Sequence, residues 1–403
     1  MSKSPRVIFG PEIWSLQIEG GISRYFQQLI RGLSESEIGG KVLTQNHANS
    51  RMSSTHIKGF EIQSLKDLKN PYKEISRLLE QETQGSIFHP TYYSQKLVDI
   101  QEPKTKMVLT VFDMISELYP ERKPRFRKVV DEKKISLQKA DHILSISKQT
   151  KDDLVRIYKV PEEKITVTYL GSNLHLHPEA ASENLPSGAY ILYVGKRSGY
   201  KNFSNFVTAY SHSKSLISNF SIIAVGGGEF SPGEMLELQN LKIADKVIQV
   251  NANDGDLASY YRKAACLVYP SLYEGFGIPI IEALYSKTPV ITSKGGCFSE
   301  AGGENSIYID ALNTDEIKVE LEELLANPEK REVMKQKGFE FVQKFNDDFI
   351  AKNCTTQSPS KFCAHNGEHE PWPTHPLAAS YRRCTRRRCF YPAAPALHSS
   401  SVH

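Results

Sequence analysis

Short apolar segments alternate with helical segments along most of the chain, and this alternation restricts the possible fold more than any other feature. In the first half we expect strands at 6–9, 41–44, 86–89, 107–112, 142–146 and 165–170, with helices at 20–33, 71–82, 125–139 and 148–158. In the second half we expect strands at 190–194, 220–225, 246–250, 266–269 and 306–310, with helices from 203, at 256–263, 315–326 and 328–345. Strands that alternate with helices pair into parallel sheets. The sequence therefore predicts an α/β protein.

A chain of 403 residues is long enough for two domains. Residues 175–188 contain several prolines and glycines and show no periodicity, which indicates a linker. We expect a first domain at 1–172, a linker at 173–188 and a second domain at 189–345. Residues 353–403 mix Pro, His, Arg and Cys without a period, and we interpret them as an atypical, disordered tail that is frame-shifted or fused.

The charge balance argues against a nucleic-acid partner. The net charge is +4, and residues 353–403 carry the whole excess, because 1–352 hold equal numbers of basic and acidic residues. Binding to nucleic acid requires a basic face on the folded part. No signal peptide or membrane-spanning segment is expected, and isolated cysteines suggest a reducing compartment. We therefore expect a cytoplasmic protein, with peripheral association at the inner membrane face as a further possibility through its basic tail.

The segment 269–293, YPSLYEGFGIPIIEALYSKTPVITS, carries the strongest chemical signal. A strand leads into the turn Gly275-Phe276-Gly277, and Pro279 suits the first turn of the helix that follows. Exposed backbone N–H groups at a helix N-terminus attract phosphates and sugar hydroxyls. Glu282 lies about one turn into the helix and can accept two hydrogen bonds from a vicinal diol such as ribose. Glu274 precedes the turn and can reach a sugar.

This paired-glutamate segment resembles the signature of retaining glycosyltransferases of family 4, which have the GT-B fold of two Rossmann-like domains with a cleft between them. The downstream segments Thr288-Pro289-Val290-Ile291 and 296–302 also fit that family, and the resemblance covers roughly residues 5–350. It implies that the second domain binds the donor, a nucleotide-diphosphate sugar, with Glu282 on the ribose. It further implies that Glu274 and the backbone of Gly275, Phe276, Gly277 and Ile278 orient the transferred sugar.

Two loops of the second half add candidate donor-binding residues. Lys201 and a neighbouring cation, Lys196 or Arg197, lie in a glycine-containing loop after the strand 190–194, where cations suit a diphosphate. The resemblance implies a basic pair at this position, and the identity of the second cation stays open. Gly226 and Gly227 follow the strand 220–225, and they permit close approach of the backbone to a ligand.

The acceptor-side candidates lie in the first half. Gly20, Gly21 and Arg24 open a helix after the first strand, in a loop that borders the cleft in the resembled family. His89 and Asp113 follow apolar strands, at the carboxyl ends where open α/β sheets bind ligands. Relatives often carry a histidine that contacts the transferred sugar where this chain has Phe112. Asp113 is therefore the polar candidate there, and we expect it to be catalytic together with Glu274. His89 is the third catalytic candidate, although a lone histidine is more often structural.

Asp254 and Asp256 form an Asp-x-Asp pair, which is the metal-binding mark of a different glycosyltransferase architecture. We interpret Asp256 instead as the N-cap of the helix that follows it. No metal site and no cofactor are expected, because the cations and the helix N-terminus supply the positive charge that the leaving diphosphate needs.

These observations predict a retaining hexosyltransferase that acts on a hydroxyl of a glycan or lipid-linked acceptor, in surface polysaccharide biosynthesis such as that of lipopolysaccharide. The donor is expected to be GDP-mannose, with a UDP-sugar as the other candidate. Two alternatives remain open. One is an epimerase or a phosphorylase on the same fold, and the other is a non-catalytic protein that binds nucleotide sugars.

Overall fold

The computed structural model describes residues 6–17, 20–45, 57–66, 68–82, 85–100, 105–119, 124–172 and 185–345. The chain divides into two compact units, Met1–His365 and Asn366–His403, and the second lies outside the described residues. The predicted tail at 353–403 and most of the predicted linker therefore lie outside the described residues. All described residues belong to the first unit.

The first half of this unit contains a seven-stranded sheet in the order β3-β2-β1-β4-β5-β6-β7. All neighbouring strands are parallel. The strands are β1 (Val7–Phe9), β2 (Gly40–Thr44), β3 (Phe60–Ser64), β4 (Ile87–His89), β5 (Lys106–Val111), β6 (His142–Ser145) and β7 (Ile165–Val167). The helices are α1 (Glu12–Leu16), α2 (Gly21–Glu35), α4 (Pro71–Glu80), α5 (Ile115–Leu118), α6 (Pro124–Lys139) and α7 (Lys148–Tyr158), with short 3-10 turns at Gln95–Asp99 and Glu162–Lys164.

The second half contains a six-stranded parallel sheet in the order β10-β9-β8-β11-β12-β13. Its strands are β8 (Tyr190–Val194), β9 (Ser221–Val225), β10 (Val247–Val250), β11 (Cys266–Tyr269), β12 (Val290–Ser293) and β13 (Ile307–Ile309). The helices are α8 (Phe203–Ser211), α9 (Lys214–Asn219), α10 (Pro232–Asn240), α11 (Asp254–Lys263), α12 (Ile278–Tyr285), α13 (Phe298–Gly302), α14 (Thr314–Ala326) and α15 (Pro328–Val342), with 3-10 turns at Gly199–Lys201, Gly303–Asn305 and Gln343–Phe345.

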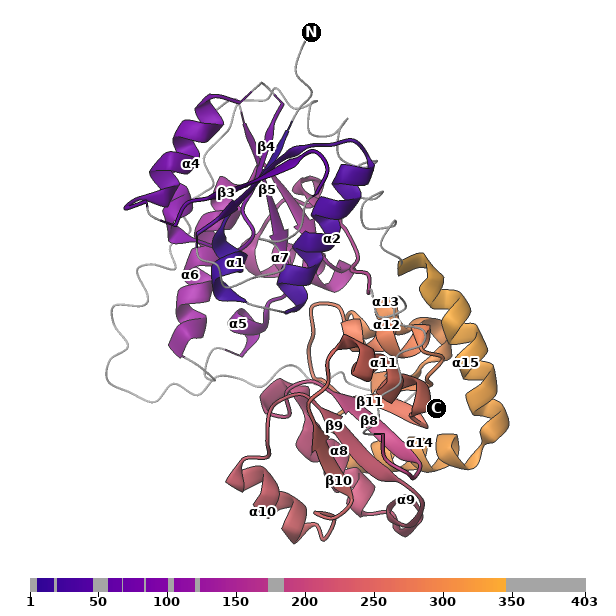
Figure 1. Cartoon of the computed structure of the whole chain (residues 1–403). Helices are drawn as coiled ribbons and strands as arrows, with labels where there is room; N and C mark the ends of the chain where they lie inside the picture. The colour runs from indigo at the N-terminus through magenta and orange to yellow at the C-terminus, as the bar shows by residue number, and fades with distance from the viewer. Residues whose placement is uncertain are drawn as a thin grey trace, which may run out of the picture. The chain divides into compact units, whose positions relative to one another are not determined.

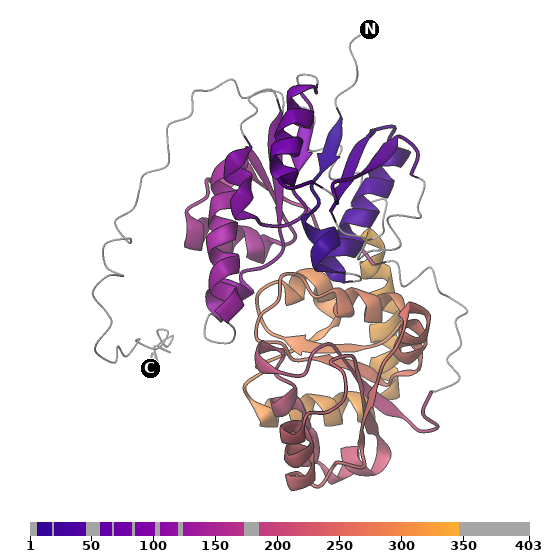
Figure 2. The ribbon, with the colours of Figure 1, turned by 60° about the vertical axis from the view of Figure 1, so that its left-hand side comes forward.

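Helices cover both faces of each sheet (Figure 1 and Figure 2). Successive strand side chains point to opposite faces, so each buried strand contributes to two cores. In β8, Ile191 packs in a cluster with α8, α9 and α14, whereas Leu192 packs in a cluster with α11 and α12. In β1, Ile8 packs toward α4 and Phe9 packs toward α2. This arrangement confirms the predicted α/β class.

One hydrophobic cluster continues from the first sheet to the second. Phe276, in the turn before α12, is 2% exposed, and its ring lies 5.6 Å from that of Tyr169 and 5.4 Å from that of Phe345. The first of these neighbours follows β7, and the second lies just beyond α15. The turn that carries the glutamate motif is therefore packed between the segment that follows the last strand of the first sheet and the C-terminal end of the described chain.

Candidate functional site

Lys201 and Glu274 meet at the carboxyl ends of two adjacent strands. Lys201 follows β8 in the turn Gly199–Lys201, Glu274 follows β11, and these strands pair with each other. The Lys201 Nζ lies 2.6 Å from Glu274 Oε1, and the Tyr269 hydroxyl donates to the same oxygen at 2.8 Å. The two side chains are 16% and 9% exposed. The structure thus joins two residues that the sequence placed 73 positions apart.

The glycines of the motif are required by close packing and by backbone conformation. Gly277 is the N-cap of α12 and has a φ of 107°, in the left-handed region that favours glycine. A Cβ atom at Gly275 would overlap the carbonyl oxygen of Phe112, at the end of β5. The turn therefore lies directly against the loop that carries Asp113.

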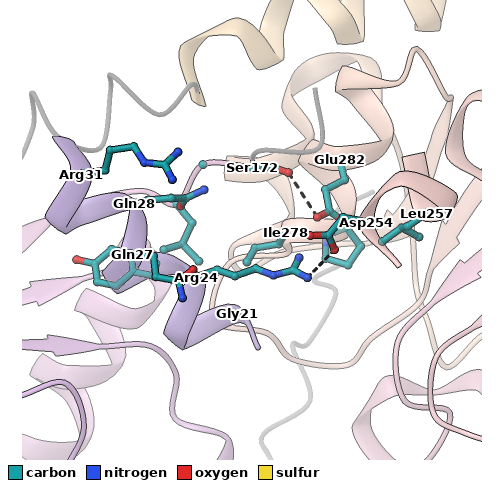
Figure 3. Close-up of a pocket in the computed structure, with 14 residues that line it drawn as sticks. Gly21, Arg24, Gln27, Gln28, Arg31, Ser172, Asp254, Leu257, Ile278 and Glu282 are labelled. Carbon is teal, nitrogen blue, oxygen red and sulfur yellow. Dashed lines mark hydrogen bonds and ion pairs between the residues drawn. The ribbon is translucent and has the colours of Figure 1, made fainter. Parts of the chain in front are cut away.

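Glu282 lies at the wall of a cavity of about 290 Å³ (Figure 3). Its Oε2 accepts a hydrogen bond from the Tyr261 hydroxyl at 2.9 Å, and its Oε1 accepts one from Ser172 Oγ at 3.4 Å. The side chain is buried, and burial raises the pKa of Glu282 to about 7. The cavity is also lined by residues of α2, of α11 and of the first turn of α12: Gly21, Arg24, Gln27, Gln28, Arg31, Leu257, Ile278 and Pro279.

Arg24 reaches across this cavity to Asp254, the first residue of α11, and the Arg24 Nη2–Asp254 Oδ1 distance is 2.6 Å. The predicted cap of this helix was wrong by three residues, because Asn253 is the N-cap and its Oδ1 accepts from the backbone N–H of Asp256. Asparagine and aspartate are both good caps, so residue type alone did not decide between them. Among the described residues, no cluster of three His, Cys, Asp or Glu side chains could hold a metal ion.

Arg197 makes its hydrogen bonds to other residues of the second half of the chain. Its guanidinium donates to Glu234 Oε1 at 2.8 Å and to the carbonyl oxygens of Gly226, Gly228 and Glu229 at 2.7–3.0 Å. The side chain is 2% exposed and lies over the ring of Phe230. Arg197 therefore shapes the glycine turn after β9, in which Gly226 and Gly227 both have positive φ angles. Lys196 is exposed on the same loop.

The acceptor-side candidates differ in their surroundings. His89 is 3% exposed, accepts or donates a hydrogen bond at 2.9 Å with Thr110 Oγ1, and stacks on Phe9. Burial lowers the pKa of His89 to about 3, so the ring is neutral at ordinary pH. Phe112 is also buried, with its ring 5.3 Å from that of Tyr25.

Asp113 is held in place by the loop after β5. Its Oδ1 accepts from the backbone N–H of Ile115 at 2.9 Å, and its carbonyl oxygen accepts from Lys133 Nζ at 2.7 Å. Lys133 is itself buried and paired with Glu117 at 2.7 Å. Burial raises the pKa of the Asp113 carboxyl. Of the predicted acceptor-side residues, Gly21 and Arg24 line the cavity beside Glu282, whereas Asp113 lies near Glu274.

Comparison with known proteins identifies the family. A sequence model described as "Glycosyltransferase Family 4" matches residues 19–176, and one described as "Glycosyl transferases group 1" matches residues 179–341. The chain belongs to glycosyltransferase family 4. This confirms the family and enzyme class that the motif predicted.

A relative of this glycosyltransferase is the O-antigen chain mannosyltransferase RfbU of Salmonella typhimurium, which is 32% identical over 208 residues. The aligned segment covers 50% of this chain and 56% of the relative, so it spans little more than half of that protein. Sucrose-phosphate synthase from Thermosynechococcus elongatus is similar in fold, with a TM-score of 0.71, 20% identity, and coverage of 90% of this chain and 100% of that one. Anabaena HepE in complex with UDP gives a TM-score of 0.68 at 14% identity, covering 88% and 100%. These likenesses confirm the predicted GT-B fold.

Several tyrosines of this glycosyltransferase contact the motif and were missed from the sequence. Tyr269 and Tyr261 donate to the two motif glutamates, and Tyr273 donates to Asp153 Oδ2 at 2.8 Å. Tyr273 immediately precedes Glu274 and Tyr269 lies five positions before it, which was the available signal. Within the part of the chain that the structure describes, no helix has the length and apolar character needed to cross a bilayer.

Proposed function

We propose that this protein is a retaining hexosyltransferase that moves mannose from GDP-mannose to a hydroxyl group of a glycan or lipid-linked acceptor. The main support is the cluster of Lys201, Glu274 and Tyr269 beside the glycine turn, with Glu282 about one helical turn further along α12 at the wall of the cavity. The similarity to an O-antigen mannosyltransferase supports the choice of sugar and a role in surface polysaccharide assembly. A UDP-sugar is the other candidate donor, since HepE binds UDP.

In this proposal the donor diphosphate lies between Lys201 and the N-terminus of α12. The Lys201 ammonium and the backbone N–H groups around Gly277 would face the phosphate oxygens, where positive charge is most useful as the leaving group departs. Lys196 is the second cation, because Arg197 spends its donors on Glu234 and on three carbonyl oxygens. Lys201 would move from Glu274 toward the diphosphate when the donor binds.

Glu282 would accept hydrogen bonds from the two ribose hydroxyls, and Glu274 would accept from hydroxyls of the transferred sugar. The acceptor would approach from the side of Asp113. The bond between the anomeric carbon and the phosphate oxygen breaks, and a bond from that carbon to the acceptor oxygen forms on the same face. The acceptor proton passes to the departing phosphate oxygen, so no protein nucleophile is required. The lysine cations and the N-terminus of α12 would stabilise the negative charge of the leaving diphosphate, and the proposal includes no metal.

The acceptor is proposed to be a saccharide or a lipid-linked saccharide, and the enzyme is proposed to work in the cytoplasm at the inner face of the membrane. A lipid-linked acceptor would keep its tail in the bilayer while the sugar enters the site. This part of the proposal rests on the relatives rather than on a surface of this protein.

The test is thermal stabilisation with GDP-, UDP-, ADP- and TDP-sugars, with and without EDTA, followed by a transfer assay. Ligand that binds the folded state raises the Tm by linkage. We expect a shift with GDP-mannose that EDTA does not change and that Lys201→Ala and Glu282→Ala abolish. Lys294→Ala is the matched control, because it removes a surface lysine paired with Glu316. Conversion of the donor without an acceptor would indicate an epimerase. Phosphate-dependent cleavage of a glycan would indicate a phosphorylase, and donor binding without turnover would indicate a non-catalytic protein.

A further inference from the structure

Tyr273 connects the donor-side motif to the acceptor-side loop. It immediately precedes Glu274, and its hydroxyl lies between two groups from the first half of the chain. The hydroxyl accepts a hydrogen bond from the backbone N–H of Met114 at 3.2 Å. It donates to the Oδ2 atom of Asp153 at 2.8 Å. One hydroxyl therefore serves as donor and acceptor in two contacts that are 159 and 120 residues distant in sequence.

Asp153 gives this hydroxyl a fixed partner. The carboxylate is 1% exposed, lies on α7, and also accepts from Gln149 Nε2 at 2.9 Å and from Arg156 Nη2 at 2.5 Å. Three donors on two carboxylate oxygens leave it little freedom to move. The position of the Tyr273 hydroxyl is thus set by α7, a helix of the first half of the chain, although Tyr273 itself belongs to the second half.

Met114 directly follows Asp113, so the other contact acts on the acceptor-side loop. On the far side of Glu274, Gly275 packs against the carbonyl oxygen of Phe112, which directly precedes Asp113. The Thr150 hydroxyl also points to the carbonyl oxygen of Gly275 at 3.4 Å. The neighbours of Glu274 therefore contact the neighbours of Asp113. Tyr273 hydrogen-bonds to Met114, and Gly275 packs against Phe112.

We propose that Tyr273 is a positioning residue that fixes the distance between Glu274 and the Asp113 loop, and so aligns the donor sugar with the acceptor hydroxyl. This inference rests on the proposed function. The Tyr273 hydroxyl is hydrogen-bonded to Met114 and Asp153, so in this proposal it acts through Glu274 and the Asp113 loop and not on a substrate. Group transfer is sensitive to misplacement, and a shift of about 1 Å can reduce the rate by about 100-fold. A loosened loop also admits water, so the donor would be hydrolysed more often for each successful transfer.

The experiment compares Tyr273→Phe with the wild-type enzyme, because phenylalanine keeps the ring and removes only the hydroxyl. We expect kcat for transfer to fall by about 10- to 100-fold. The Kd of the nucleoside diphosphate, measured calorimetrically, should stay within about twofold, since neither Lys201 nor Glu282 is touched. The ratio of donor hydrolysis to transfer should rise, and the Met114 amide should exchange faster with solvent because it has lost its acceptor.

Tyr210→Phe is the matched control. The Tyr210 hydroxyl donates to the carbonyl oxygen of Phe220 at 2.6 Å, in the hydrophobic cluster of α8, α9 and α14 rather than in that of α12. The variant should therefore have a lower Tm and unchanged kcat and hydrolysis ratio. If wild-type enzyme transfers sugar and Tyr273→Phe keeps kcat and the hydrolysis ratio, the positioning role is overturned while the proposed function stands. If Tyr210→Phe lowers kcat as much, the effect is one of general stability and the positioning role is again overturned. If wild-type enzyme transfers from none of the four donors, the proposed function fails and this inference fails with it.

Discussion

Gly275 and the carbonyl oxygen of Phe112 are so close that no side chain fits between them, because a Cβ atom at position 275 would overlap that oxygen. The contact joins the turn after β11 to the end of β5, next to the hydrogen bond between Tyr273 and Met114 that joins the same two loops.

Gly275→Ala should therefore be strongly destabilising and nearly inactive. The methyl group meets backbone rather than a flexible side chain, so the turn itself has to move, and overpacking of this kind costs about 1–3 kcal/mol or more. Chemical denaturation and the transfer assay measure both effects. Gly233→Ala is the control, since nothing lies within 4 Å of its Cβ position in α10 and alanine favours the helix. Equal stability of the two variants would contradict the contact.

Lys201 and Arg197 should respond differently to removal. Arg197→Ala leaves Glu234 Oε1 and three carbonyl oxygens without the guanidinium donor, and a buried acceptor left unpaired costs about 1–3 kcal/mol. Lys201→Ala should cost less stability, because Tyr269 still donates to Glu274, but it should abolish the Tm shift with donor. Urea unfolding and thermal shift separate the two. Donor binding that survives in Lys201→Ala would argue against the proposed diphosphate site.

Glu282 should make stability and donor binding depend on pH in opposite directions. Its pKa is raised from 4.5 to about 7 by burial, so between these values the folded protein keeps a proton that the unfolded chain has released. Stability therefore falls as pH rises from about 4.5 to 7, by about 3 kcal/mol for this group. Donor affinity should rise over the same range if Glu282 binds the ribose as proposed, because the ionised carboxylate would then accept from both hydroxyls. Glu282→Gln should remove this part of the slope, and parallel pH–stability curves for variant and wild type would refute the assignment.

His89 should contribute to acid unfolding rather than to the chemical step. Its pKa is lowered from 6.5 to about 3 by burial, so below about pH 6.5 the unfolded chain binds a proton that the folded protein excludes. Stability from this group is lost as pH falls from about 6.5 to 3, by up to about 5 kcal/mol. His89→Leu should unfold at lower pH relative to its own neutral stability, with kcat at pH 7.5 within about threefold of wild type. A much larger loss of kcat in a well-folded variant would restore His89 to the catalytic candidates.

Local patterns in the sequence were sufficient to predict the two parallel sheets and to select the residues of the candidate site. Periodicity is a property of neighbouring residues, so β1 and β8 could be recognised before any contact was known. Glu274 and Lys201 were both assigned to the donor, because each follows a strand of the second half and ligands bind at the carboxyl ends of parallel strands. Some short or polar elements were not predicted, including β3 and α1, and α10 was missed although its Ser231–Glu234 capping box is a recognised signal.

Only the tertiary structure decided which partner each polar group has. From the sequence, Arg197 was as good a candidate for the diphosphate as Lys196, because both lie in the same glycine-containing loop. In the fold, its guanidinium donates to three carbonyl oxygens and to Glu234. Glu300 looked like part of a family motif, yet its carboxylate accepts from the N–H groups of Lys148 and Gln149 at the start of α7. These pairings join residues that lie far apart in the sequence. The periodicity of a segment reports which of its faces is buried, but it carries no information about which distant segment meets that face.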